Sequence, residues 1–203
     1  MTTVPRWLER DVSRETLDAL EEYAALILKW TRKINLISAS TQDEIFDRHI
    51  WDSAQIYSGQ TGTWADLGSG GGLPGVVIAI LRQGDGIRDS TVLIESDQRK
   101  ATFLRTCGRT LGLNLKVVAE RIETADPAQA AVVSARALIN LPELLAFADR
   151  HLAENGTCVL LKGATWQQEV AQARRHWQFS CRETQSKTHA QAAILEIRDI
   201  ARV

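Results

Sequence analysis

The stretch Thr63-Trp-Ala-Asp-Leu-Gly-Ser-Gly-Gly-Gly-Leu-Pro-Gly75, followed by Val76-Val-Ile-Ala-Ile-Leu81, decides the fold. Residues 63–67 are apolar and end in glycines, which predicts a short buried strand. Residues 76–81 continue as a helix, with Pro74 in its first turn, where the missing N–H costs nothing. In such a unit of strand, glycine turn and helix, free backbone N–H groups and the positive end of the helix dipole point to the same place. We therefore expect a ligand cradle whose glycines take positive φ.

The glycine pattern fits two ligands, depending on the frame. Asp66-x-Gly68-x-Gly70-x-Gly72 resembles the first motif of S-adenosylmethionine (SAM) methyltransferases, with Asp66 in reach of the donor's cationic amino group. The frame Gly70-x-Gly72-x-x-Gly75 gives a dinucleotide fingerprint instead. That frame begins three residues past the strand and carries Pro74 inside the turn, so it fits less well. A plain tight turn stays open as a third interpretation.

Length and composition restrict the class of protein. The chain has 203 residues, of which 44% are hydrophobic and 24% charged, as in an ordinary globular domain with some extra elements. No apolar run approaches the ~20 residues of a membrane span, and the first ten residues lack a signal-peptide pattern. We expect a cytoplasmic monomer. A net charge of −1 excludes a globally basic nucleic-acid binder, but not a local basic face.

The three cysteines give no sign of a metal site. They are widely spaced and form neither a CxxC pair nor a zinc pattern. We expect each to be a small buried apolar residue and expect no bound metal. They are Cys107, Cys158 and Cys181.

Two helices are expected before Gln60. Ser13 can cap a helix that runs to about Ile34, and Thr41-Gln-Asp-Glu44 forms a capping box that would open a second helix through Ser53. Apolar positions at helical spacing would form the core face of the first helix: Leu17, Leu20, Ala24, Ile27, Trp30 and Ile34.

The pattern changes after residue 60 to alternating strands and helices. Strands are expected at 63–67, 91–95, 115–119, 131–135 and 157–161, the last after an Asn155-Gly156 turn. Helices are expected at 98–111, 141–152 and 167–175, and a closing pair of strands at 179–184 and 192–197. This alternation indicates an α/β fold, a parallel sheet with helices on both faces. We expect a helical extension over residues 1–60 and one compact domain over 61–203.

The ends of the expected strands carry charged residues. Ligands of open α/β sheets bind outside the carboxyl ends of the strands. The second strand ends at Glu95, 23 residues past Gly72, close to the interval for a carboxylate that binds ribose hydroxyls. The fourth and fifth strands end near Arg136 and Lys162, which would bring two cations to the cleft.

Short motifs along the chain support a more specific interpretation. In order they are Asn35-Leu36, Arg48-His-Ile-x-Asp-Ser53, Asp66-x-Gly-Ser-Gly-Gly-Gly-Leu-Pro-Gly75, Glu95-Ser96, Lys100-x-x-Phe-Leu104, Arg121-x-Glu123, Ser134-Ala-Arg-Ala137 and Leu161-Lys-Gly163. Together they resemble the bacterial small-subunit rRNA guanine-N7 methyltransferase family, also called glucose-inhibited division protein B, over about residues 17–197.

The resemblance implies a fold, a cofactor and a substrate. The fold is that of a class I SAM-dependent methyltransferase, a Rossmann-like seven-stranded and mostly parallel sheet with an N-terminal helical extension. SAM would donate the methyl group. The acceptor would be N7 of one guanine, guanosine 527, of 16S rRNA in the small ribosomal subunit.

The resemblance also assigns roles to residues at the matching motifs. Arg136 would close the cofactor cleft, Glu95 would hold the ribose, and Ile122 and Glu123 would flank the adenine. The remaining SAM-binding residues would be Asp66, Gly68, Gly70 and Leu73. We expect RNA phosphates to meet Lys29, Arg32, Lys33, Arg48, Arg136 and Lys162. A basic residue in the family's last strand is matched loosely by Arg198.

Methylation of N7 needs few catalytic groups. Guanine N7 carries a free lone pair, so no general base is required and positioning supplies most of the rate. We expect Asn35, Arg48, Asp52 and Arg136 to position the reactants. Asp52 is equally well explained as the ion-pair partner of Arg48, four residues earlier on one helix.

Three alternatives remain at this point. The first is a SAM-dependent methyltransferase that acts on another acceptor. The second is an NAD(P)-dependent oxidoreductase that uses the second glycine frame, and the third is a binding module without catalytic activity. The oxidoreductase interpretation is weakened because the chain has no Tyr-x-x-x-Lys pair; its two tyrosines are Tyr23 and Tyr57.

Overall fold

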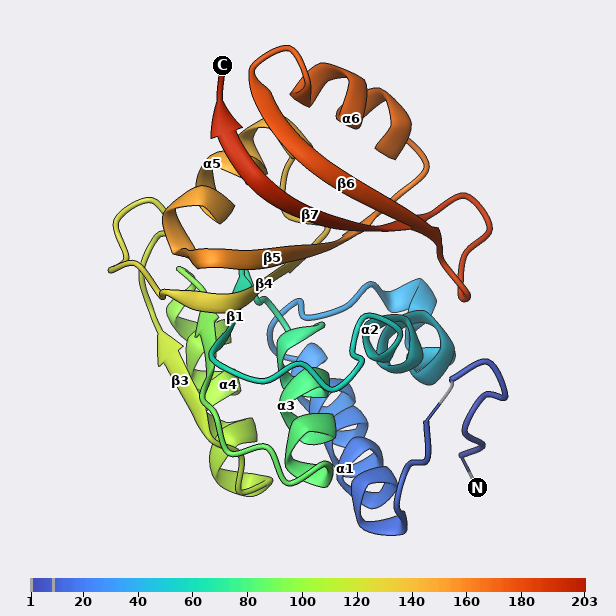
Figure 1. The fold of residues 1–203 in the computed structure, drawn as a ribbon. Coiled ribbons are helices and arrows are strands. Elements are labelled where there is room, and N and C mark those ends of the chain that lie inside the picture. The colour runs from blue at the N-terminus through green and yellow to red at the C-terminus, as the bar shows by residue number, and fades with distance from the viewer. Residues whose placement is uncertain (1, 9) are drawn as a thin grey trace.

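The computed structural model describes residues 2–8 and 10–203, which form one mixed sheet with helices on both faces (Figure 1). The sheet has the strand order β3-β2-β1-β4-β5-β7-β6. Strands β1 to β5 pair in parallel, and β7 runs antiparallel to β5 and β6. The strands are β1 (Trp64–Leu67), β2 (Thr91–Ile94), β3 (Leu115–Val118), β4 (Ala130–Arg136), β5 (Leu152–Lys162), β6 (Trp177–Gln185) and β7 (Ala193–Arg202). The expected seven-stranded, mostly parallel sheet is confirmed for the described residues.

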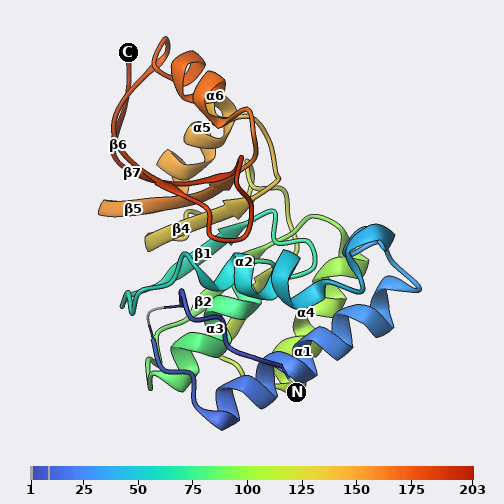
Figure 2. The same ribbon diagram turned by 90° about the vertical axis from the view of Figure 1, so that its right-hand side faces the viewer.

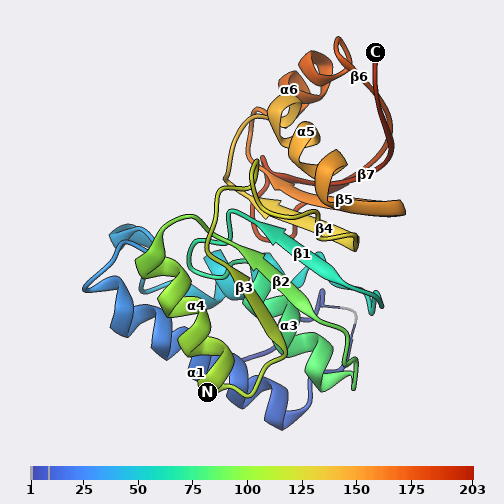
Figure 3. The ribbon, with the colours of Figure 1, turned by 90° about the vertical axis from the view of Figure 1, so that its left-hand side faces the viewer.

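Helices cover the two faces of the sheet unequally (Figures 2 and 3). One core cluster joins α1, α3 and α4 to the sheet through residues such as Ile27, Leu81 and Phe103. A second cluster joins α5 and α6 to the opposite face through residues such as Leu144 and Val170. The helices are α1 (Arg14–Thr31), α2 (Trp51–Ala54), α3 (Gly75–Gly84), α4 (Gln98–Thr110), α5 (Leu141–His151) and α6 (Trp166–Ala173).

The first strand lies in the interior of the sheet, next to its central strand β4. All four residues of β1 are buried, because β2 and β4 flank the strand and helices cover both faces. The strand order changes direction between β1 and β4, which is the position where open α/β sheets bind their ligands. The loop from β1 to α3 begins at this switch point.

Helix α1 packs the N-terminal segment onto the sheet domain. It begins after Ser13, whose side chain accepts a hydrogen bond from Thr16 N at 3.2 Å, as the sequence predicts. The helix ends at Thr31, three residues before the expected end. Side chains from residues before 60 and after 61 share the first core cluster, so the expected domain boundary stays a prediction.

The second expected helix forms differently. Residues 39–41 make a 3₁₀ turn, Phe46–Ile50 make a π-helical turn, and α2 follows directly. Thr41 caps no helix, because its hydroxyl contacts His49 Nε2 at 2.7 Å and donates to Ser38 O at 3.1 Å. The capping-box prediction is therefore wrong. π-helical turns are rare and frequently occur at functional sites.

Strand β5 begins earlier than the sequence predicts. Asn155 takes a φ of +61°, yet the strand runs through it from Leu152. The Asn155-Gly156 pair thus lies in an irregular part of the strand. The pairing of β4 with β5 shifts register in the same part.

Candidate functional site

The loop between β1 and α3 takes the conformation that its glycines allow. Gly68, Gly70 and Gly72 have φ values of +63°, +55° and +84°, which confirms the predicted positive φ at these positions. A Cβ atom on Gly72 would lie 2.4 Å from Val76 Cγ2, so this glycine also permits close packing of the loop on α3. A Cβ atom on Gly70 would meet nothing closer than Gly68 O at 3.8 Å. Gly70 is therefore the open position of the loop.

The backbone amides of the loop are less free than the sequence suggests. Ser69 N donates to Ile94 O at 3.1 Å, and Gly72 N donates to Ser69 O at 2.7 Å. At the start of α3, Gly75 N donates to Asp66 Oδ2 at 3.2 Å. The expectation that this helix start offers a free N–H to a ligand is wrong at Gly75, because the Asp66 carboxylate already accepts from it.

Asp66 supports the loop from beneath. Its side chain is buried, with 1% of the residue exposed, and Oδ1 accepts from Ser134 Oγ on β4 at 2.7 Å. Burial raises the pKa of Asp66 to about 6, although the hydrogen bonds from Ser134 and Gly75 act in the opposite direction. The carboxyl group thus connects β1, β4 and α3. Contact with the amino group of a methyl donor stays a prediction.

Glu95 holds the open end of the same loop. It is the residue after β2 and is largely buried, with 8% exposed. Its Oε2 accepts from Gly70 N at 2.8 Å, and its Oε1 accepts from Asp97 N at 2.8 Å. Each carboxylate oxygen has a second lone pair, so ribose hydroxyls can still donate to it. Glu95 therefore combines a structural role with the predicted ribose role.

The turn after β3 carries the residues assigned to the adenine. Ile122 is buried, and its carbonyl oxygen lies 2.9 Å from His151 Nε2, which fixes the turn against α5. Glu123 is exposed and pairs with Arg121 at 3.2 Å. Leu73, in the glycine loop, is also buried. Their predicted contacts with the cofactor are proposals.

A cavity of about 770 Å³ opens beside the glycine loop. Leu36 lies in its wall and would sit 3.4 Å from a Cβ atom on Gly71. Leu138 also lies in the wall and would sit 2.4 Å from a Cβ atom on Gly68. The cavity and the glycine loop thus share these two leucines. Five segments line the cavity: residues 36–41, 48–52, 136–140, 161–169 and 186–193.

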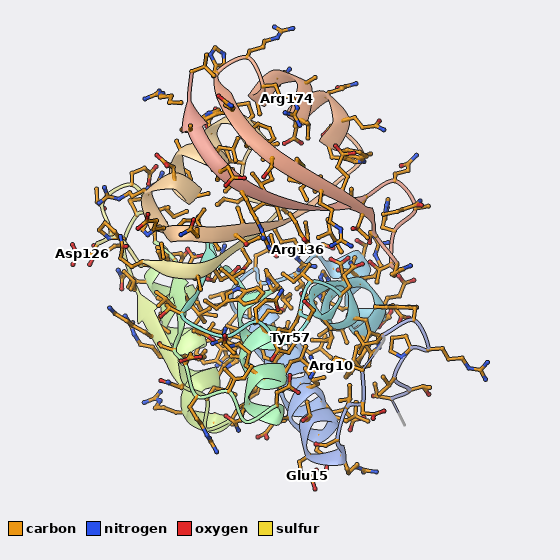
Figure 4. The ribbon with its side chains drawn as sticks, viewed as in Figure 1. Arg10, Glu15, Tyr57, Asp126, Arg136 and Arg174 are labelled. Atoms are coloured by element: carbon orange, nitrogen blue, oxygen red, sulfur yellow. The ribbon has the colours of Figure 1, made fainter. Side chains whose placement is uncertain are left out.

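Arg136 and Asp52 join the sheet to the N-terminal segment across this cavity. Arg136 Nη1 donates to Asp52 Oδ2 at 3.1 Å and to Arg48 O at 3.3 Å. Asp52 Oδ1 accepts from Gln55 Nε2 at 2.9 Å and from the hydroxyl of Thr188. In Figure 4, Arg136 lies near the centre of the molecule, between β5 and α2. The predicted ion pair between Arg48 and Asp52 does not form. The Asp52 carboxylate, just after the π-helical turn, pairs with Arg136 instead.

His49 completes the network, and the sequence alone did not assign it a role. Its Nδ1 lies 3.1 Å from Arg136 Nη2. A guanidinium can only donate, so Nδ1 accepts and Nε2 carries the proton toward Thr41 Oγ1. Burial and then the charge of Arg136 lower the pKa of His49 to about 4. At neutral pH this imidazole is uncharged and both nitrogens are engaged.

Apart from Arg136, which pairs with Asp52, the cations predicted to meet RNA fall into two groups. Lys29, Arg32 and Lys33 at the end of α1 are exposed, as are Asn35 and Arg48. None of the four cations among them forms an ion pair with any residue in the described ranges. They are thus available to a polyanion.

Lys162 differs from these cations. Its Nζ donates to Ile139 O at 2.8 Å and lies 2.6 Å from Glu169 Oε2, with 8% of the side chain exposed. The ammonium group therefore ties the segment after β4 to α6. Its predicted phosphate contact is inconsistent with this burial, and Lys162 is assigned a structural role instead.

No helix within residues 2–8 and 10–203 is long and apolar enough to cross a membrane. Within the same ranges, no group of three His, Cys, Asp or Glu side chains is placed to hold a metal ion.

The strand order, the glycine loop after β1 and the acid after β2 define the fold of a class I SAM-dependent methyltransferase. Solved structures agree: the precorrin-6y C5,15-methyltransferase from Geobacter metallireducens aligns with a TM-score of 0.52 at 14% identity, covering 82% of this chain and 93% of that chain. M. jannaschii TYW2 in complex with AdoMet aligns with a TM-score of 0.50 at 8% identity, covering 96% and 80%. Similarity at this level concerns the fold alone.

The sequence narrows the class further. The profile of the GidB family, described as rRNA small subunit methyltransferase G, matches residues 16–198, and the chain belongs to this family. It is 47% identical over 198 residues to the ribosomal RNA small subunit methyltransferase G of Ruegeria sp. strain TM1040, covering 97% of each chain. It is 50% identical over 196 residues to that of a Cereibacter sphaeroides strain, covering 95% of this chain and 94% of the relative. The chain is thus a methyltransferase of small-subunit rRNA.

Proposed function

We propose that this chain transfers the methyl group of SAM to N7 of one guanine, guanosine 527, in 16S rRNA. One observation carries the proposal beyond the family's general activity. The open glycine loop and the cavity share Leu36 and Leu138 as a common wall. A donor on the loop and a base in the cavity would then meet across these two side chains.

The residues of the loop fit a methyl donor. Gly70 leaves open space where any side chain would protrude, and Glu95 fixes the amide next to that space. Glu95 would bind the ribose, while Ile122 and Glu123 would flank the adenine. Asp66 would act mainly by holding the loop, with its charge near the donor's ammonium group. Gly68 and Leu73 would line the floor.

The chemistry requires alignment more than proton transfer. SAM supplies an electrophilic methyl group, and guanine N7 supplies a lone pair without losing a proton. His49 is neutral with both nitrogens engaged, which suits a site that needs no general base. Holding two reactants in line supplies up to about 7–11 kcal/mol in favourable cases. Asp52 and Arg136 would do so by fixing the cavity wall, and Asn35 and Arg48 by contacts at its rim.

The RNA would be held from the N-terminal side. Lys29, Arg32, Lys33 and Arg48 are exposed cations, and phosphate contacts position a nucleic acid without reading its sequence. Selectivity would come from stacking and edge contacts to the unpaired base. Because the whole chain carries a charge of −1, we expect weak binding to bulk RNA and preference for a folded rRNA element. We place this activity in the cytoplasm, on a monomeric enzyme.

The direct test is transfer of a tritiated methyl group from SAM to small ribosomal subunits from cells that lack the gene. The proposal predicts one methyl group per subunit, at N7 of guanosine 527. Label on a different nucleotide or on a ribosomal protein would contradict it.

Two controls separate the alternatives. Charge reversal at Lys33 and Arg48 should abolish rRNA methylation and spare SAM binding, whereas unchanged rRNA methylation would favour another acceptor. Calorimetry with SAM and NAD on the same protein should give heat with SAM only. Binding of NAD alone would favour the oxidoreductase interpretation.

A further inference from the structure

Helix α4 carries a concentration of positive charge to which no role has been assigned. Between Gln98 and Thr110 it contains four cations and no acidic residue. Arg99, Arg105 and Arg109 are exposed, and we refer to these three residues as the α4 basic face. Arg105 and Arg109 are one turn apart, about 6 Å along the helix axis, and so lie on the same side. The chain as a whole is slightly acidic, so this accumulation is local.

Folding does not account for the whole of this charge. Arg105 and Arg109 form no ion pair with any residue that the structure describes, and Arg99 pairs only with Asp97, at 3.4 Å. Arg109 is in the last turn, where a cation complements the helix dipole. Arg105 lies in the middle of the helix, where that explanation does not apply.

Helix α4 packs against α1 near the basic end of that helix. Within α1, Thr16 packs on Gly84, and the Tyr23 hydroxyl donates to Gly71 O in the glycine loop at 2.6 Å. About two turns after Tyr23, Trp30 packs against Phe103 of α4 with ring centroids 5.5 Å apart. The first half of α1 carries its acidic residues and Arg14, which pairs with Asp18, whereas only cations lie at or just after its end. The acidic residues are Glu15, Asp18, Glu21 and Glu22, and the cations at the end are Lys29, Arg32 and Lys33.

We propose that the α4 basic face binds the phosphate backbone of the rRNA substrate, away from the target base, and adds to the phosphate contacts proposed for the cations at the end of α1. This inference rests on the proposed rRNA substrate. Helices α1 and α4 pack together through Trp30 and the buried Phe103, and α1 contacts the glycine loop through Tyr23. Phosphate contacts strengthen binding at low salt and carry no sequence information.

The test compares the Arg105→Gln/Arg109→Gln variant with the parent in filter binding to small ribosomal subunits from cells lacking the gene. Each lost phosphate contact lowers the slope of log affinity against log salt by about 0.7–0.9, so the double variant should lose about 1.4–1.8. The variant-to-parent ratio of Kd should then shrink about tenfold between about 50 and 200 mM salt. SAM affinity should not change, and the melting temperature should fall by no more than about 4 °C, because Arg109 no longer complements the helix dipole.

A matched control neutralises two exposed cations on the other face of the sheet, Lys116→Gln and Arg175→Gln. Lys116 alternates along β3 with Leu115 and Val117, which pack toward the α1 side, and Arg175 follows α6. This variant should keep the parent's affinity and salt slope. An equal loss in both variants would show a general charge effect and would overturn the proposal.

The remaining outcomes distinguish the two proposals. If the parent methylates small subunits and the α4 variant keeps the parent's Kd and salt slope, the α4 proposal is wrong and the proposed function stands. If the parent neither binds nor methylates small subunits, the proposed function is wrong, and the α4 proposal that rests on it is overturned as well. A photo-crosslinking side chain introduced at position 105 should attach to rRNA in the particle. Attachment to a ribosomal protein instead would overturn the RNA assignment.

Discussion

Replacing Gly70 by valine separates the donor site from the stability of the loop. At Gly70 the φ is +55°, and a Cβ atom would meet only Gly68 O, at 3.8 Å. The folded protein should therefore lose only the cost of a left-handed side chain, about 1–2 kcal/mol. For a chain of this size that lowers the melting temperature by about 2–8 °C. The two methyl groups of the valine would project into the space that we assign to SAM.

Gly112→Val is the matched control. Gly112 has a φ of +61° and no atom within 4 Å of its Cβ position, but it follows α4 at the opposite edge of the sheet. The backbone cost should be the same for both variants. Inserting methyl groups into an occupied space costs about 1–3 kcal/mol, which weakens binding about 5- to 150-fold. We expect this loss of SAM affinity for Gly70→Val and parent affinity for Gly112→Val.

Isothermal calorimetry with SAM and thermal unfolding of the apoprotein are the two measurements. The reasoning is refuted if Gly70→Val binds SAM as tightly as Gly112→Val, because the open side of the loop would then not face the donor. It is also refuted if Gly70→Val is much less stable than Gly112→Val, because the loop would then be packed against protein at Gly70.

Three other changes test single interactions. Glu95→Ala should weaken SAM by about 1.5–3 kcal/mol, the range for charge-assisted hydrogen bonds, and unchanged calorimetric affinity would disprove the ribose role. Asp52→Asn should lower kcat/KM for small subunits about tenfold or more, since it disturbs the hold on Arg136, and should leave SAM affinity unchanged; a loss of SAM affinity would place Asp52 in the donor site. Because the folded pKa of His49 is lowered from 6.5 to about 4, its contribution to stability is complete above pH 6.5 and is lost as the pH falls through 4. As the pH is lowered from 6.5 to 4, the free energy of unfolding measured in urea should therefore fall less for His49→Gln than for the parent. An equal fall in both proteins would contradict the lowered pKa of His49.

Local signals predicted the sheet domain well. Buried strands with glycine or polar ends are visible in a single sequence, so β1 to β4 fall within two residues of the expected bounds. Positive φ at Gly68, Gly70 and Gly72 also follows from local chemistry. The start of α1 followed from Ser13, whose side chain caps the helix as expected.

Long-range contacts account for what the sequence did not predict. Arg48 and Asp52 are spaced for an ion pair on a regular helix. The Asp52 carboxylate binds Arg136 instead, 84 residues later in the chain. The Lys162 ammonium group donates to the carbonyl oxygen of Ile139, 23 residues earlier in the chain, and pairs with Glu169 on α6. No spacing rule connects Asp66 to Ser134, so the position of the carboxylate beneath the loop could not be predicted from the sequence. Tertiary contacts decide the state of each of these charged groups.

A crystal structure of the protein with bound SAM would test the central claim most directly. The account predicts the donor on the Gly70 side of the loop, with its ribose on Glu95 and its methyl group directed between Leu36 and Leu138 into the cavity. A donor bound elsewhere, or a methyl group directed away from the cavity, would contradict the account.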